Sequence, residues 1–340
     1  MDTAAGDSAV EKIKKLAKAT FTDGVLSEIG SFGGFFEPKL TGMTEPVLIS
    51  SADGVGTKLK LAFMTGRHVT VGQDLVNHCI NDILVHGARA IFFLDYIATG
   101  KLSPDIIAEV VKGLSVACQD AGVALLGGET AEMPDFYQAG EYDLAGFIVG
   151  LVDKGKVING SSIEEGDVCI GLRSDGLHTN GYTLARKVAF DIAGLKPGDK
   201  VEGLDGTIDE VLMQVHRCYA NPIHSLLAEH PVRGMAHITG GGLQGNLNRI
   251  IPDGLAARIR LDSWSRPAVF EFLQREGNID EAEMFHAFNM GIGYVLVVEP
   301  DLADAVAGEL TSLGETAYRI GEIVDAHQDT NDGNEKVTLV

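Results

Sequence analysis

Apolar residues follow two spacings along the first half of the chain, and each spacing predicts a different element. Val10, Ile13, Leu16 and Ala17 recur at helical spacing, which predicts a helix that ends near Thr20. Short unbroken apolar runs between glycines or polar turns predict buried strands instead. These patterns predict strands at 47–51, 90–98, 123–126 and 142–152, and helices at 74–86 and 103–122.

The second half alternates the same two patterns after a polar, turn-rich passage at 160–166. We place a domain boundary in that passage, so that residues 1–165 form one domain and residues 166–340 a second. A length of 340 residues is typical of two domains. Strands are expected at 168–172 and 235–239, and helices at 180–192, 207–216 and 222–229.

Composition narrows the classes of function. The chain has 27 basic and 48 acidic residues, and a net charge of −21 argues against nucleic acid or an anionic membrane as a partner. The longest apolar run, near 290–298, is too short to span a membrane. The four cysteines are far apart and lack a zinc-binding spacing, so we expect reduced thiols in a cytoplasmic protein.

The segment Asp53–Lys58, with the sequence Asp-Gly-Val-Gly-Thr-Lys, follows a predicted strand and precedes a predicted helix. Its glycines could turn backbone amides toward a phosphate, or the segment is a tight turn whose aspartate caps the helix. Farther on, Asp74, His78 and Asn81 share one helix stripe with Asp82 beside them. Carboxylates on a largely apolar helix need a cation or hydrogen-bond donors, and their oxygens suit Mg²⁺. Asp74 could equally be an N-cap.

Three later motifs carry candidate site residues. Glu129 follows two glycines at the expected end of a strand, where open α/β sheets bind ligands, whereas Glu132 is interpreted as a turn residue. His178 lies among small polar residues at a predicted helix start and could be an acid, a base or a phosphate donor, although most loop histidines are only solvated. Gly240–Gly242 is a weaker anion-binding candidate. Together these motifs predict a magnesium–nucleotide enzyme acting on a phosphorylated small molecule.

The two halves share the short pattern Asp-Gly-x-x-Thr, at 53–57 and again at 175–179. Each copy follows a predicted strand and precedes a predicted helix. The pattern indicates equivalent turns in the two domains, but chance explains so short a match equally well.

Longer blocks carry a family resemblance. The segments Gly127–Pro134 (Gly-Gly-Glu-Thr-Ala-Glu-Met-Pro) and Phe288–Gly291 (Phe-Asn-Met-Gly) are the most specific of a series that runs from about Ala9 to Val324. Through these blocks the chain resembles the phosphoribosylformylglycinamidine cyclo-ligase family, whose members are also called aminoimidazole ribonucleotide synthetases. It departs from the family pattern at Leu247–Arg249 and in a longer tail at 326–336.

The resemblance implies ATP-dependent ring closure of formylglycinamidine ribonucleotide to aminoimidazole ribonucleotide, with ADP and phosphate released through an iminophosphate, in purine biosynthesis. It also implies a homodimer that pairs the mixed sheets of the N-terminal domains, and a C-terminal α/β domain with helices on a mixed sheet. The implied Mg²⁺ ligands are Asp53, Asp82 and Glu129, and the implied catalytic residues are His178, Asp53 and Lys58. The implied nucleotide-binding residues are Lys14, Gly54, Gly56, Thr57, Asp74, Asn81, Gly128 and Thr130, and the substrate-binding residues are Thr179, Asn180, Gly240 and Gly241.

Two alternatives stay open at this point. A kinase of the same superfamily, similar to thiamine-monophosphate kinase or selenophosphate synthetase, would share the positions of Asp53 and Asp82 but not the two most specific blocks. A selenophosphate synthetase would also need a reactive N-terminal cysteine, and the first cysteine here is Cys79. A binding protein without activity would be expected to have lost carboxylates, and all of them are present.

Overall fold

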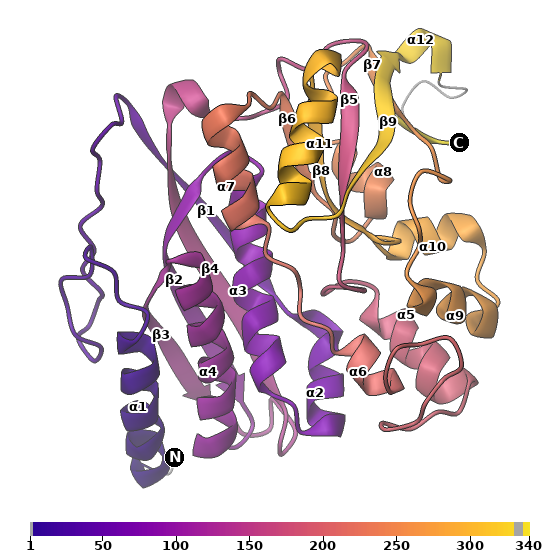
Figure 1. Ribbon diagram of the computed structural model, residues 1–340. Helices are drawn as coiled ribbons and strands as arrows, with labels where there is room; N and C mark the ends of the chain where they lie inside the picture. Colours follow the sequence, from indigo (N-terminus) through magenta and orange to yellow (C-terminus); the bar gives the residue numbers. More distant parts are fainter. Residues whose placement is uncertain (1–2, 330–335) are drawn as a thin grey trace. The chain divides into compact units, whose positions relative to one another are not determined.

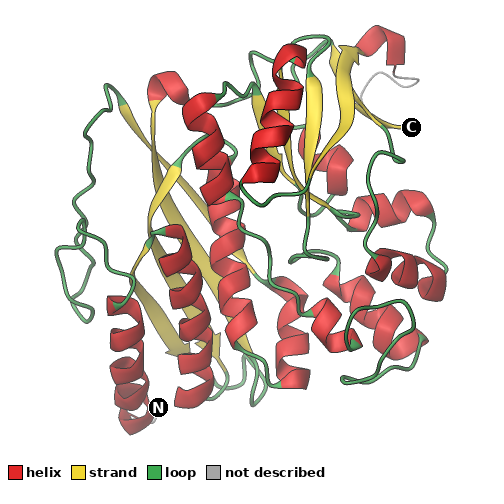
Figure 2. Ribbon diagram, viewed as in Figure 1, coloured by secondary structure: helices red, strands yellow, loops and turns green. Residues whose placement is uncertain are grey.

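The computed structural model describes residues 3–329 and 336–340, so that part of the unusual tail lies outside the described residues. The chain divides into two compact units, one running to Leu84 and from Ala88 to Lys156, the other made of Val85–Gly87 and Val157–Val340. This division precedes the predicted boundary at residue 165. Each unit has its own mixed sheet with packed helices (Figures 1 and 2), which confirms the predicted fold class of two domains. Among the described residues, no helix combines the length and apolar character needed to cross a membrane.

The first unit contains a four-stranded sheet in the order β1-β4-β2-β3, in which only β2 and β3 run parallel. Helix α3 packs on β1, β4 and β2, and helix α4 packs on α3 and β3 (Figure 1). Burial alternates along much of β1, as expected for a strand with helices on one face. The elements are α1 (Thr3–Lys18), β1 (Pro46–Gly54), η1 (Gly56–Lys58), α2 (Leu59–Thr65), α3 (Val69–Leu84), β2 (Arg89–Thr99), α4 (Pro104–Ala121), β3 (Ala124–Glu132), β4 (Tyr142–Asp153) and η2 (Lys154–Lys156).

Helix α3 begins at Val69, well before the predicted start at Asp74. The prediction was wrong because Gly72 disfavours a helix interior by local propensity. In the fold this glycine is required: a Cβ there would collide with the Val110 carbonyl oxygen of α4 and lie 3.0 Å from the Gly113 Cα atom. The two glycines therefore allow α3 and α4 to pack closely, and Asp74 becomes an interior helix residue.

The second unit contains a six-stranded sheet in the order β10-β7-β9-β5-β8-β6, mostly antiparallel. Helix α11 packs on β5, β9 and α7, and helix α8 contacts β6 and β10. All residues of β8 are buried, so this strand is covered on both faces. The elements are β5 (Val168–Arg173), α5 (Tyr182–Arg186), η3 (Lys187–Ile192), α6 (Ile208–Leu212), α7 (Ala220–Glu229), β6 (Gly234–His237), α8 (Gly242–Leu247), β7 (Leu255–Ile259), α9 (Ala268–Gly277), α10 (Glu281–Ala287), β8 (Ile292–Val298), η4 (Pro300–Leu302), α11 (Ala303–Ser312), β9 (Ala317–Asp325), α12 (Ala326–Asp329) and β10 (Val337–Leu339).

Two helices of the second unit are shorter than predicted. The helix expected at 180–192 is the short α5 followed by a π-helical segment, η3. The helix expected at 207–216 is only α6, which begins with a capping box between Thr207 and Glu210. Residues 214–219 have no regular secondary structure. The candidate residues near 178 are therefore flanked by irregular segments rather than by long helices.

Candidate functional site

A polar cluster forms where the end of β1 meets α3 in the first unit. His78 and Asp82 lie one turn apart on α3, and the His78 Nε2 atom is 2.7 Å from Asp53 Oδ2 and 3.8 Å from Asp82 Oδ2. The Ser51 hydroxyl donates a hydrogen bond to Asp82 Oδ2 at 3.1 Å. The Asp53 and Asp82 side chains are 43% and 24% exposed, whereas His78 is buried. Both carboxylates are therefore accessible to a cation.

The charge balance of this cluster favours a cation. Burial by itself lowers the pKa of the His78 imidazole, but the hydrogen bond to Asp53 and the charges of Asp82, Asp53 and Asp74 outweigh it and raise the pKa. One imidazolium neutralises only one of the two carboxylates in the cluster. Carboxylate oxygens are the protein ligands that Mg²⁺ takes beside nucleotide phosphates. Two of the predicted metal ligands, Asp53 and Asp82, thus lie together in a donor set that fits Mg²⁺.

Lys58, predicted to be catalytic, is buried. Its Nζ atom lies 2.8 Å from Asp74 Oδ2, and both side chains are 0% exposed. Burial lowers the pKa of Lys58, and the charge and hydrogen bond of Asp74 oppose that effect. The pair ties η1 to the interior of α3, so Asp74 is not the N-cap that the sequence allowed. This geometry favours a structural role for both residues, and their contact with a nucleotide stays a prediction.

The other predicted nucleotide-binding residues of this unit are spread over several elements. The segment Gly54–Thr57 lies at the end of β1 and in η1, next to the polar cluster, and Gly56 adopts a left-handed φ of 65°. Asn81 is fully buried on α3. Lys14 lies on α1, where its Nζ atom would be 3.5 Å from a Cβ at Gly30. The structure thus brings the turn and α3 together, while Lys14 belongs to a helix that packs on α4 and β3.

The third predicted metal ligand, Glu129, does not join the cluster within one chain. Strand β3 continues to Glu132, so the predicted strand end at residue 126 was wrong. In the sheet register Asp53 and Gly128 share one row and therefore one face, whereas the next residue, Glu129, points to the opposite face. Because β1 and β3 are the two edges of the sheet, Glu129 is also roughly 14 Å from Asp53.

Gly128 has a packing role that the sequence does not reveal. A Cβ at Gly128 would collide with the carboxylate of Asp95, its register partner on β2. Burial raises the pKa of Asp95 to about 7. The glycine therefore accommodates a half-buried acid in mid-sheet, and Thr130 lies two residues farther along on the same face.

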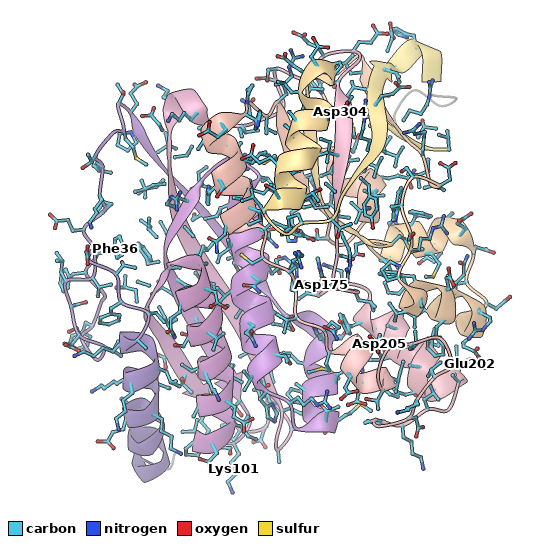
Figure 3. All side chains as sticks on the ribbon, in the orientation of Figure 1. Phe36, Lys101, Asp175, Glu202, Asp205 and Asp304 are labelled. Atoms are coloured by element: carbon cyan, nitrogen blue, oxygen red, sulfur yellow. The ribbon has the colours of Figure 1, made fainter. Side chains whose placement is uncertain are left out.

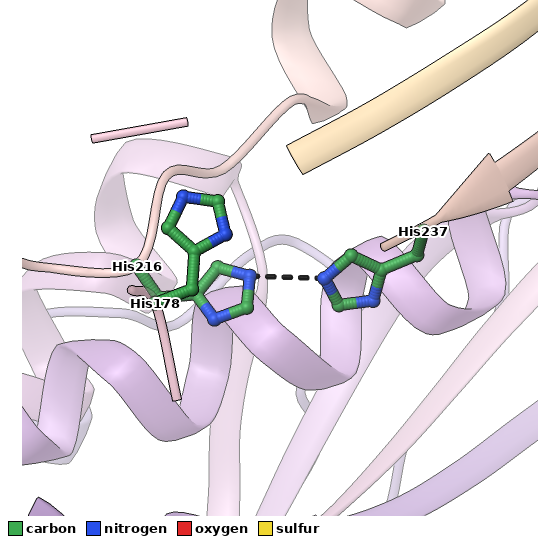
Figure 4. Close-up of side chains that lie close together, drawn as sticks. All are labelled: His178, His216 and His237. Atoms are coloured by element: carbon green, nitrogen blue, oxygen red, sulfur yellow. Dashed lines mark hydrogen bonds between the residues drawn. The ribbon is translucent and has the colours of Figure 1, made fainter. Parts of the chain in front are cut away.

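In the second unit the candidate residues lie in the turn Ser174–Gly181, which can be found by the Asp175 label in Figure 3. His178 adopts a left-handed φ of 61° and is only 1% exposed. The helix expected from Asn180 begins at Tyr182 and is short, so His178 lies in the turn ahead of it. The His178 ring stacks on the His216 ring, with ring centroids 4.1 Å apart and an angle of 22° between the planes (Figure 4).

The predicted substrate-binding residues of this unit meet in space. A Cβ at Gly240 would lie 3.3 Å from the Asn180 Oδ1 atom. Thr179, next to Asn180, lies 3.2 Å through its Oγ1 atom from His216 Nδ1. Gly241 has a left-handed φ of 89° and precedes α8, and the Asn246 side chain donates to the Gly240 carbonyl at 3.3 Å. Residues 179, 180 and 240 therefore form one polar neighbourhood.

Sequence reasoning missed the residues that hold this neighbourhood in place. His216 is the last residue of a segment predicted as helix and Arg217 follows it directly, and neither carries a motif. Asp175 was part of the repeated pattern, but nothing local indicated its partner, the Arg217 guanidinium at 2.9 Å. His237 stood beside the triple glycine and could have been suspected, because its strand ends at the predicted anion-binding loop.

The chain matches two family descriptions in succession. Residues 40–152 match "AIR synthase related protein, N-terminal domain", and residues 164–331 match "AIR synthase related protein, C-terminal domain". A phosphoribosylformylglycinamidine cyclo-ligase of Syntrophotalea carbinolica is 52% identical over 340 residues, which cover 100% of this chain and 96% of that protein. The enzyme of that name from Nitratidesulfovibrio vulgaris is 51% identical over 323 residues, covering 95% and 92%.

Solved structures share the fold at lower identity. A thiamine-monophosphate kinase from Stenotrophomonas maltophilia has a TM-score of 0.72 at 18% identity, covering 98% of this chain and 95% of its own. The hydrogenase maturation protein HypE in complex with ATP has a TM-score of 0.69, also at 18% identity, covering 95% and 88%. These likenesses concern the fold alone. By contrast, the full-length relatives confirm the resemblance found in the motif blocks, and the chain belongs to the phosphoribosylformylglycinamidine cyclo-ligase family.

Proposed function

We propose that this protein catalyses the ATP-dependent ring closure of formylglycinamidine ribonucleotide to aminoimidazole ribonucleotide, releasing ADP and phosphate. The observation that carries the proposal is identity near 50% over almost the whole chain to enzymes of that name. ATP would phosphorylate the formyl amide oxygen, and the amidine nitrogen would then attack the iminophosphate carbon and expel phosphate. Such a reaction depends mainly on positioning and on neutralising phosphate charge.

The first unit supplies groups for the nucleotide. Asp53 and Asp82 would hold Mg²⁺, which supplies positive charge to the ATP phosphates when bound. His78 orients Asp53 by its short contact, and Gly54–Thr57 would present backbone amides to a phosphate. The network of Thr179, Asn180 and Gly240 in the second unit would hold the ribonucleotide. Because His178 is buried, its contact with substrate would require neighbouring residues to move, and orientation of the turn is the simpler role.

A homodimer is part of this proposal. The face of the first sheet opposite α3 carries exposed apolar residues, including Leu48 at 65% and Phe147 at 44% exposure. An apolar sheet face of this kind suits burial against a second copy. Glu129 points to this same face, so if it binds the metal it would do so from a partner chain. The four free thiols support a cytoplasmic location.

The decisive experiment measures ADP and aminoimidazole ribonucleotide with formylglycinamidine ribonucleotide as the only acceptor. We expect equal amounts of both products, and neither from the Asp53→Asn variant. Asp105→Asn, which removes an exposed carboxylate of the same unit, is the matched control and should keep full turnover. Phosphate transfer to thiamine monophosphate or selenide, with no ring closure, would contradict the proposal and favour the kinase alternative.

A mixing experiment tests the shared site. At Mg-ATP concentrations well below saturation, Asp82→Asn and Glu129→Gln chains are each expected to turn over slowly. Co-refolded mixtures should regain part of the activity because one of the two sites in a mixed dimer is intact. No recovery, together with a monomer in sedimentation, would show that the sites are complete within one chain. Phe147→Glu should shift the wild-type dimer toward monomer by placing charge in an apolar interface.

A further inference from the structure

Two irregular segments of the second unit are linked side chain by side chain. The Tyr219 hydroxyl donates to the Arg173 carbonyl at 2.8 Å, and the Arg217 guanidinium donates to the Asp175 carboxylate at 2.9 Å. The next contacts involve His216, whose Nδ1 atom lies 3.2 Å from Thr179 Oγ1 and whose ring stacks on His178. The segment 214–219 therefore follows the turn at 173–179 along its whole length.

The segment is itself anchored. Arg217 binds Glu315 through two hydrogen bonds of 2.9 and 3.0 Å, and the Glu315 side chain is 5% exposed. His216 Nε2 lies 3.0 Å from His237 Nε2 at the end of β6 (Figure 4). Charge-assisted hydrogen bonds such as those between Arg217 and Glu315 are the strong ones in proteins. The segment 214–219 thus transmits the positions of β6 and of the start of β9 to the turn.

The turn needs such support. His178 is a non-glycine residue in the left-handed region, a conformation that persists only where the surroundings enforce it. Its Nε2 atom accepts a hydrogen bond from the Asp175 amide at 3.3 Å, so the neutral ring carries its proton on Nδ1. On β8, a Cβ at Gly293 would lie 2.5 Å from His178 Cε1 and would collide with the Tyr219 hydroxyl. The glycine therefore leaves the space that the two rings occupy.

We propose that the segment 214–219 is a positioning brace for the turn Ser174–Gly181, and that His216 is the positioning residue that holds the His178 ring where its Nε2 atom accepts the Asp175 hydrogen bond, which in turn keeps the proton on Nδ1. The importance of this turn for turnover rests on the proposed function, whereas the brace itself does not. Ring nitrogens of His178, His216 and His237 lie within 4.8 Å of one another, which raises the alternative of a transition-metal site. Three imidazoles on one tetrahedral metal direct their nitrogens at a common centre, about 109° apart, and two nearly parallel stacked rings cannot do so.

The test compares His216→Ala, His216→Phe and His216→Gln in the full-length enzyme, with the exposed His286→Gln as the control in the same unit. Nitrogen NMR of labelled histidine reports the His178 tautomer, and steady-state kinetics separate kcat from KM. We expect His216→Ala to mix the two tautomers and to lower kcat about tenfold, with the KM for Mg-ATP unchanged. His216→Phe, which keeps the stacked face, should recover much of the kcat, and His286→Gln should match the wild type.

The proposal requires both changes. An unaltered tautomer, or a kcat within twofold of the wild type in folded His216→Ala, would overturn it; if that variant does not fold, the same criteria apply to His216→Gln. Visible d–d absorption after adding Co²⁺ to the wild type, lost in His216→Ala, would also overturn it in favour of a metal site. Full turnover by His178→Ala would contradict the function proposed for this turn, while the tautomer measurement would still decide the brace.

Discussion

The two Asp-Gly-x-x-Thr turns occupy similar places in their units but differ in what their aspartates contact. The first begins with the last two residues of β1 and the second just after β5, and each leads toward a helix. Asp53 contacts an imidazole that it shares with a second carboxylate, Asp82, and is 43% exposed. Asp175 instead binds the guanidinium of Arg217, which also binds Glu315.

The difference shows that a local motif sets the position of a turn, while partners distant in sequence set its charge. The first turn keeps excess negative charge on accessible carboxylates and suits a cation. In the second turn the Asp175 carboxylate is already paired with the Arg217 guanidinium, and this ion pair holds Arg217 beside the turn. A divalent metal is therefore expected at the first turn and not at the second.

The largest effect is expected from Asp74→Ala, which removes the buried partner of Lys58 in the first turn. Breaking a buried ion pair by removing one member typically costs about 3–5 kcal/mol, because a charge is left in a desolvated place. Urea unfolding measures the loss. Asp105→Ala, which breaks the exposed pair with Lys12, should leave the midpoint unchanged. Equal midpoints for both variants would show that the Lys58–Asp74 pair is not structural.

The next effect concerns the second turn. His178→Ala should lower turnover on the order of 10²-fold, because it removes either a preorganised donor or the side chain that orients the turn. Calorimetry should show little change in Mg-ATP affinity, because the Asp175 carboxylate of this turn is already paired with the Arg217 guanidinium. A loss confined to apparent substrate affinity would leave His178 a positioning residue and contradict a catalytic one.

Asp95 provides a contrast within the first sheet. It shares a register row with Asp53, but burial raises the pKa of its carboxyl to about 7. The Asp95 carboxyl holds its proton more tightly in the native protein than in the unfolded chain. The free energy of unfolding therefore falls as pH rises from about 4 to about 7. Full burial would make this cost roughly 4 kcal/mol at pH 8. Since the residue is only half-buried, we expect Asp95→Asn to raise the free energy of unfolding by about 2 kcal/mol at pH 8 and to leave it unchanged at pH 4. Urea unfolding of both proteins at pH 4 and pH 8 measures the difference in the free energy of unfolding. An equal gain in stability at pH 4 would exclude titration of Asp95 as its cause.

The smallest effect tests the comparison most directly. Asp82→Asn should weaken Mg-ATP binding about tenfold in calorimetric titration, because it removes a carboxylate oxygen from the first cluster. Asp175→Asn is the matched variant of the second turn and should leave that affinity unchanged. If Asp82→Asn binds Mg-ATP as the wild type does, Asp82 is not part of the site; if Asp175→Asn weakens binding equally, the two turns do not differ as proposed.

Local patterns in the sequence were enough to locate most strands and both turns. The period of apolar positions depends only on neighbouring residues, and it correctly indicated β2, β4, β5 and α4. Motif blocks were also sufficient for the family, because each block preserves a contiguous set of residues. Asp53 and Asp82, two of the implied metal ligands, lie together because one ends a strand and the other lies on the face of a helix that packs on it; their binding of Mg²⁺ stays a prediction.

Contacts between residues far apart in the chain were decided only by the tertiary structure. Lys58 has a buried partner because α3 extends past Gly72, whose place in the helix depends on its contact with α4. Glu129 points away from Asp53 because β3 pairs with β2 through two glycines that local propensity assigns to a turn. The brace around His178 depends on Arg217 meeting Asp175 and Glu315. Burial and ion pairing are set by which segments meet in space, and that information is absent from any short stretch of sequence.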